Sequence, residues 1–94
     1  MYARVTTFEG GTGEALRKAS EEVNASSGPP PGVPAKGFTM LIDPDSGKSI
    51  GIALFESEED YVKGDEGLNA MTPSNDGGHR VSVEKYEVGA DIRL

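Results

Sequence analysis

Hydrophobic and polar residues alternate, or recur at helical spacing, in successive segments of this 94-residue chain. Residues 2–8 have the alternating side chains of a strand, and two consecutive glycines predict its end. After Thr12, a suitable N-cap, apolar residues recur at helical spacing as far as Val23. A run of prolines then predicts that this amphipathic helix ends near Gly28.

A β-hairpin is the strongest local signal. Two apolar runs, residues 38–43 and 49–55, flank residues 44–48, which are rich in the residue types that form turns. The pattern therefore predicts two consecutive antiparallel strands in the middle of the chain.

A second helix is predicted to begin after Ser57, because Ser57 and Asp60 have the spacing of a capping box and the first turn is acidic. Gly64 and Gly67 lie inside this helix, where each costs about 1 kcal/mol relative to alanine. We therefore expect the second helix to be short or broken. The apolar residues that share its face are Tyr61, Leu68 and Met71.

The last strand is predicted over residues 80–88, after a loop over residues 72–78. The order strand, helix, strand, strand, helix, strand predicts an α+β fold of ferredoxin-like βαββαβ topology, with a four-stranded antiparallel sheet and both helices on one face. Residues 1–94 are too few for two ordinary domains, so we expect a single domain with a small core.

Apolar side chains are predicted on both faces of this sheet. Along the first hairpin strand, Leu41 points away from Phe38 and Met40. A sheet covered by helices on one face only is expected to be polar on the other, so the pattern calls for a second cover. A second copy of the chain would supply it, which predicts a homodimer in which two sheets form a dimeric α/β barrel.

Charge and composition exclude several classes of partner. The formal net charge of −7 disfavours binding to nucleic acid or to an anionic membrane surface. The chain has no cysteine, no apolar run long enough to span a membrane and no apolar secretory segment near its start. These features predict a cytoplasmic protein, and no residue pattern indicates a metal or a cofactor.

The chain resembles the antibiotic biosynthesis monooxygenase-like (ABM) family of the dimeric α/β barrel superfamily. The residues that carry the resemblance are 2–7, 37–38, 43–48, 54–59 and 84–88. The resemblance implies a homodimer with a pocket between sheet and helices. Some members oxidise phenols with molecular oxygen and no bound cofactor, whereas others degrade haem with His, Asn and Trp in the pocket. The absence of Trp disfavours the haem-degrading branch, and no catalytic motif of the other branch is matched.

Three residues are candidates for chemistry. His79, the single histidine, is a candidate general base, although an exposed loop position is the default interpretation. Arg4 is a candidate for binding a substrate carboxylate or enolate, and the alternative is a solvated position at the sheet rim. Tyr61 is a candidate for presenting its hydroxyl to a pocket, and the alternative is an ordinary core position.

These observations leave three functional hypotheses. The first is a dimeric protein that binds a small hydrophobic or aromatic molecule in a pocket between sheet and helices. The second is a cofactor-independent monooxygenase that acts on a phenolic or quinone-like substrate. The third is a module that regulates a partner enzyme.

Overall fold

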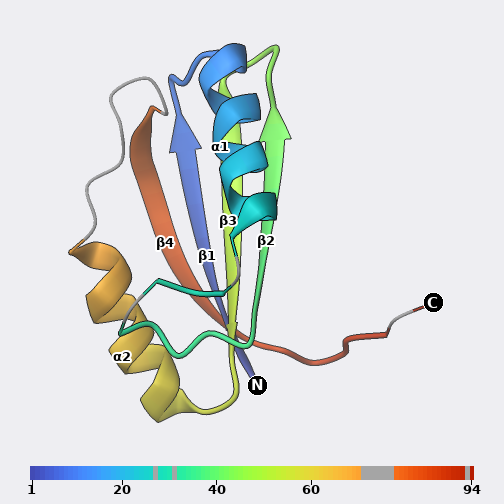
Figure 1. Ribbon diagram of the computed structural model, residues 1–94. Coiled ribbons are helices and arrows are strands. Elements are labelled where there is room, and N and C mark those ends of the chain that lie inside the picture. Colours follow the sequence, from blue (N-terminus) through green and yellow to red (C-terminus); the bar gives the residue numbers. More distant parts are fainter. Residues whose placement is uncertain (27, 31, 71–77, 93) are drawn as a thin grey trace.

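Six elements make up the computed structural model, which describes residues 1–26, 28–30, 32–70, 78–92 and 94 (Figure 1). In chain order they are β1 (Tyr2–Glu9), α1 (Gly13–Ala25), β2 (Gly37–Asp43), β3 (Lys48–Phe55), α2 (Glu58–Asn69) and β4 (His79–Glu87). The predicted α+β class and the predicted order of elements are confirmed.

The four strands form one open antiparallel sheet in the order β2-β3-β1-β4. This arrangement is compatible with a ferredoxin-like fold. Both helices lie on the same face of the sheet, as Figure 1 shows. In that layer Ser20 of α1 contacts Met40 of β2, and Asp65 of α2 binds Arg4 of β1.

Both helices begin at the caps that the sequence predicts. The Thr12 hydroxyl accepts a hydrogen bond from the backbone N–H of Ala15 at 3.1 Å, and the Ser57 hydroxyl accepts one from Asp60 at 3.1 Å. α1 ends at Ala25, three residues before Gly28. It stops there because both the backbone N–H and the hydroxyl of Ser26 donate to the carbonyl of Val23, which occupies that acceptor.

The expectation that the second helix is short or broken is wrong. α2 runs without interruption from Glu58 to Asn69, through both glycines. A Cβ atom on Gly64 would collide with the ring of Phe55, and one on Gly67 would lie 2.9 Å from Cγ2 of Val33. The glycines therefore let α2 approach the core closely, and this packing offsets their low helix propensity. Met71 and the predicted loop over residues 72–77 lie outside the described residues.

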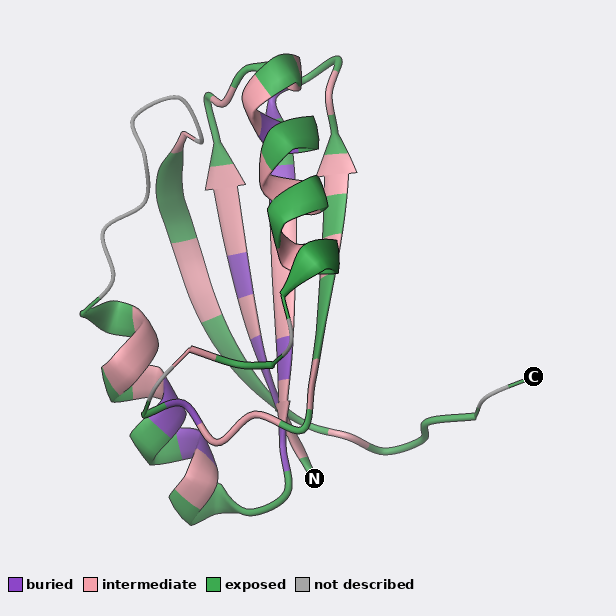
Figure 2. Ribbon diagram, viewed as in Figure 1, coloured by how far each residue is buried: buried purple, intermediate pink, exposed green. Residues whose placement is uncertain are grey.

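The hydrophobic core lies between α2, β1 and β3 (Figure 2). Phe55 is fully buried, and its ring meets that of Tyr61 edge to face with the ring centroids 5.6 Å apart. Val33, from the segment between α1 and β2, and Ala53 complete this cluster. A segment without regular secondary structure thus contributes directly to the core.

The opposite face of the sheet, which neither helix covers, also carries apolar side chains. We call it the open sheet face and define it by Val5 of β1, Leu41 of β2, Ile50, Ile52 and Leu54 of β3, and Tyr86 of β4, whose registers place them together. Leu41 and Tyr86 are about half exposed, at 51% and 50%. The predicted two-sided apolar pattern is therefore present. In the described part of the chain, neither helix is long and apolar enough to cross a membrane.

Candidate functional site

A cavity of about 770 Å³ lies between the second half of α1, the segment that joins α1 to β2, and the sheet. Its described lining residues are Ala19, Glu22, Val23, Ser26, Gly28, Pro29, Pro30, Val33, Ala35, Lys36, Gly37, Phe38, Ala53 and Leu68. Most of these side chains are apolar. We refer to this space as the cavity.

α1 forms one wall because Ala19 and Val23, four residues apart, lie on the same side of the helix. Both are apolar and only partly exposed. They belong to the apolar stripe from which the sequence predicted an amphipathic helix. Small side chains at these positions leave room between α1 and the sheet.

The proline-rich segment forms the facing wall, and backbone hydrogen bonds fix its path. The N–H of Val33 donates to the carbonyl of Pro30 at 3.1 Å, and the N–H of Lys36 donates to the carbonyl of Leu54 at 2.7 Å. Val33 itself is buried, with 5% of its surface exposed. Prolines also restrict the backbone of this wall.

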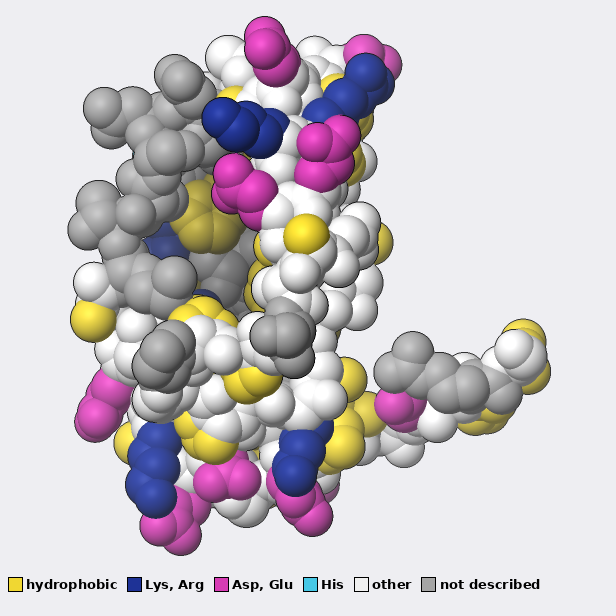
Figure 3. Space-filling model, in the orientation of Figure 1, with side chains coloured by type: hydrophobic (Ala, Val, Ile, Leu, Met, Phe, Trp, Pro, Cys, Tyr) yellow, Lys and Arg dark blue, Asp and Glu magenta, His cyan; other side chains and the backbone are white. Residues whose placement is uncertain are grey.

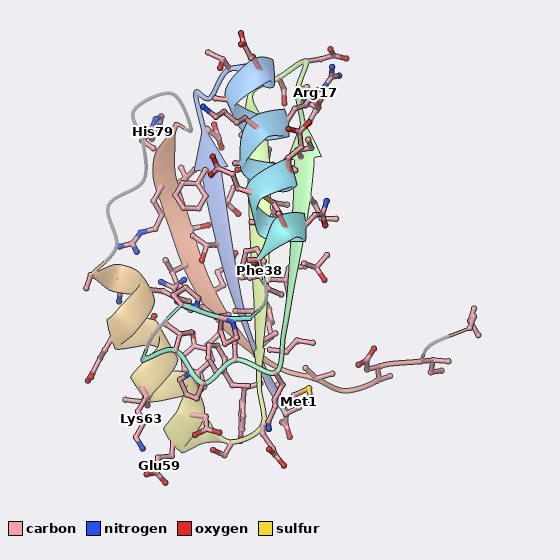
Figure 4. All side chains as sticks on the ribbon, in the orientation of Figure 1. Met1, Arg17, Phe38, Glu59, Lys63 and His79 are labelled. Carbon is pink, nitrogen blue, oxygen red and sulfur yellow. The ribbon has the colours of Figure 1, made fainter. Side chains whose placement is uncertain are left out.

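Phe38, the second residue of β2, supplies an aromatic wall. It is 49% exposed, although its ring lies on the helix-covered face close to Gly51. Figure 4 shows it just beyond the end of α1. An aromatic ring half exposed at the edge of an apolar cavity offers a surface on which a second ring can stack.

Ionisable groups are few around the cavity. Among the described lining residues they are Glu22 and Lys36, and Lys36 pairs with Glu56 at 3.3 Å in an exposed ion pair. Neither His79, Arg4 nor Tyr61 is among the described lining residues. The described lining of the cavity is therefore mainly apolar, with Glu22 and Lys36 as its ionisable residues.

Arg4 is buried between β1 and α2, with 5% of its surface exposed. Its Nε atom donates to Oδ1 of Asp65 at 2.8 Å, and its Nη1 atom donates to the hydroxyl of Thr6 at 2.9 Å. Its Nη2 atom donates to Oδ1 of Asn69 at 2.9 Å. Arg4 therefore belongs to a hydrogen-bonded cluster. This cluster lies beside the cavity, because the neighbour of Arg4 on β3 is Ala53, which lines the cavity.

Tyr61 is a core residue in α2 and is 7% exposed. The Nζ atom of Lys85 lies 5.1 Å from the centre of its ring, a cation–π contact. Burial raises the pKa of Tyr61 above its ordinary value of 10.0, and the negative charge of Asp65 raises it further. The Tyr61 hydroxyl is therefore protonated at neutral pH and is not a base.

His79 is the exposed first residue of β4, where it pairs with Glu9 of β1. Arg4 and Glu9 are five residues apart along β1, which is roughly 17 Å in a strand. Figure 4 shows His79 at the far end of β4 from the site of Phe38. The structure therefore brings Arg4 and Tyr61 together around Asp65 and leaves His79 apart from both.

Sequence reasoning missed Asp65 and Asn69, which hold the side chain of Arg4. One signal was present, because Tyr61, Asp65 and Asn69 are spaced four residues apart and so lie along one side of a helix. Polar residues in line with a core tyrosine indicate that a buried polar group faces them.

Comparison of this chain with protein-family models, with curated proteins and with solved structures found no match.

Proposed function

We propose that this protein binds a small hydrophobic or aromatic molecule in the cavity. The observation that carries the proposal is the cavity of about 770 Å³ with its mainly apolar lining. That volume lies within the range of about 300 to 1,000 Å³ that is usual for small-molecule sites. Apolar ligand surface removed from water contributes roughly 25 cal/mol per Å² in favour of binding.

Phe38 is the residue through which an aromatic ligand would be recognised. Its exposed ring is the largest apolar side chain on the cavity wall, and a bound ring would cover it. Contact between two aromatic rings contributes about 1 kcal/mol beyond the area that it buries.

Replacing Phe38 by alanine is expected to weaken binding of the neutral fluorescent aromatic N-phenyl-1-naphthylamine about tenfold, because both the stacking surface and buried area are lost. Fluorescence titration of the purified protein measures this change. Leu41→Ala is the matched control, since Leu41 lies on the same strand but on the open sheet face. Equal affinity in the two variants would place the ligand elsewhere.

The alternative is a cofactor-independent monooxygenase for phenolic or quinone-like substrates, which the family resemblance suggested. Such a reaction needs a base that removes a proton from the substrate. Glu22 is the carboxylate among the described lining residues, whereas His79 is remote from the cavity. The geometry supports binding better than catalysis. Oxygen uptake with a panel of phenols and hydroquinones tests this alternative. Loss of uptake in His79→Ala would support His79 as the base, and unchanged uptake would remove it from the mechanism.

The predicted homodimer, a dimeric α/β barrel, also belongs to this proposal. The open sheet face supports it, because an antiparallel sheet with helices on one side is normally polar on the other. A second copy placed against this face would bury its apolar residues symmetrically, with the cavities left on the outside of the paired sheets.

Leu41→Lys is therefore expected to raise the dimer dissociation constant at least about tenfold, because pairing would bring the new charges into an apolar interface. Val62→Lys on α2 is the matched control, since Leu41 and Val62 are both 51% exposed and tolerate a charge equally in the monomer. Native mass spectrometry across micromolar concentrations reports both constants. A monomeric wild-type protein at these concentrations would contradict the homodimer.

A further inference from the structure

Two arginine side chains converge on a single oxygen atom beside the cavity. Oδ1 of Asn69 accepts hydrogen bonds from Nη2 of Arg4 at 2.9 Å and from Nη1 of Arg80 at 2.6 Å. Two guanidinium groups thus point their N–H donors at the position of one neutral amide oxygen. An oxygen atom that carried negative charge would be bound more strongly at that position.

In the described part of the chain, carboxylates do not balance the charges of these two arginines. Asp65 pairs with Arg4 at 2.8 Å, whereas the contact of Arg80 within the described residues is the one to Asn69. Two permanent positive charges therefore share one carboxylate. This surplus occurs in a chain of net charge −7, so it is a local feature and not a property of the whole surface.

The cluster adjoins the cavity along two elements. Leu68, which lines the cavity, precedes Asn69 in α2, and Ala53, also in the lining, is the β3 partner of Arg4. Figure 3 shows a hollow between the two helices, with hydrophobic and Lys or Arg side chains on its floor. One molecule can therefore place an apolar part in the cavity and a charged group at the arginines.

We propose that the position of the Asn69 amide oxygen is an anion subsite, and that the ligand is an aromatic or hydrophobic molecule that carries a carboxylate, sulfonate or similar anionic oxygen group. This inference rests on the proposed function of the cavity. Asn69 is the exposed last residue of α2, so its side chain can turn to solvent and leave both arginine donors to the ligand. We call this position the Asn69 subsite.

Negative charges of the chain oppose anion binding at this position. Asp65 lies within the cluster and repels an anion, but it already accepts a hydrogen bond from Arg4. Glu22, which lines the cavity, also repels an anion, and physiological salt screens exposed charges farther than about 8 Å away. The subsite requires that the charge of Arg80, which acts at direct contact, exceed this repulsion.

The test compares two fluorescent probes that share their aromatic rings. 8-Anilinonaphthalene-1-sulfonate carries a sulfonate, and N-phenyl-1-naphthylamine lacks it. We expect the sulfonate probe to bind the wild-type protein about tenfold more tightly, because charge-assisted hydrogen bonds to Arg4 and Arg80 add to the same apolar contacts. Arg80→Gln is expected to abolish this difference and to leave the neutral probe unaffected.

Arg17→Gln is the matched control, because it removes one positive charge from an exposed position on α1. It should leave the preference for the sulfonate probe intact. Asn69→Asp places a carboxylate of the protein itself at the subsite, and it should weaken binding of the sulfonate probe but not of the neutral probe. Asn69→Ala should preserve or increase the affinity for the sulfonate probe.

The outcomes separate the subsite from the cavity. Equal binding of the two probes to the wild-type protein, or an equal loss of preference in Arg17→Gln and Arg80→Gln, would overturn the subsite while the cavity stands. If neither probe binds, the binding function fails and the subsite fails with it. Circular dichroism of each variant confirms that the compared proteins are folded.

Discussion

Asp65→Ala is expected to lower the free energy of unfolding by about 2 to 3 kcal/mol, because it leaves the buried guanidinium of Arg4 without its carboxylate. Arg4 is 5% exposed, so little water is available to replace the lost partner of its guanidinium. The effect is smaller than for a fully buried pair, since the Asp65 side chain is 34% exposed and water reaches it. Urea unfolding followed by circular dichroism measures the change.

Arg4→Met provides the control for this prediction. It replaces the buried charge by an apolar side chain of similar length, and the partly exposed Asp65 can then be hydrated. We expect Arg4→Met to cost less than Asp65→Ala. In the Arg4→Met background, Asp65→Ala should have almost no effect. A full effect in that background would show that Asp65 stabilises the fold by some route other than the ion pair.

Gly64→Ala is expected to destabilise the protein by about 2 kcal/mol, although alanine is by far the better helix former. The new Cβ would collide with the ring of Phe55, which is fully buried and has no space to move into. The cost of forcing α2 away from the core exceeds the gain of about 1 kcal/mol in helix propensity. The midpoint of thermal or urea unfolding reports the net effect.

Gly67→Ala in the same helix is the matched control. Its Cβ would lie 2.9 Å from Cγ2 of Val33, a milder approach than the collision of a Gly64 Cβ with the Phe55 ring, so Gly67→Ala should cost less than Gly64→Ala. If Gly64→Ala were as stable as the wild-type protein, or more stable, the close packing of α2 on Phe55 would be contradicted.

The parts of the fold that depend on local signals were predictable. The caps at Thr12 and Ser57, the hairpin and the order of elements follow from residues close together in the sequence. The continuity of α2 was not predictable from local signals. Gly64 is favoured by its contact with Phe55, a tertiary contact that helix propensity does not describe. Helix propensity predicted too short a helix because tertiary packing against Phe55 determines the length of α2.

The candidate site was less predictable than the fold. Arg4 was a candidate for binding a substrate anion or for a solvated rim position. It is instead buried, and its partners Asp65 and Asn69 lie 61 and 65 residues away along the chain. The cavity wall depends on how the segment around Val33 folds back onto the sheet, and no short-range pattern predicts that path. Distance along the sequence is therefore the reason that the site escaped sequence reasoning.

Titration with N-phenyl-1-naphthylamine, observed in methyl-resolved NMR spectra, tests binding in the cavity most directly. The account predicts saturable shifts of the methyl signals of Val23, Val33 and Leu68, which line the cavity. The methyl signals of Ile50 and Leu54 on the open sheet face serve as internal controls and should move little. Shifts confined to Ile50 and Leu54, or no saturable shift at all, would contradict it.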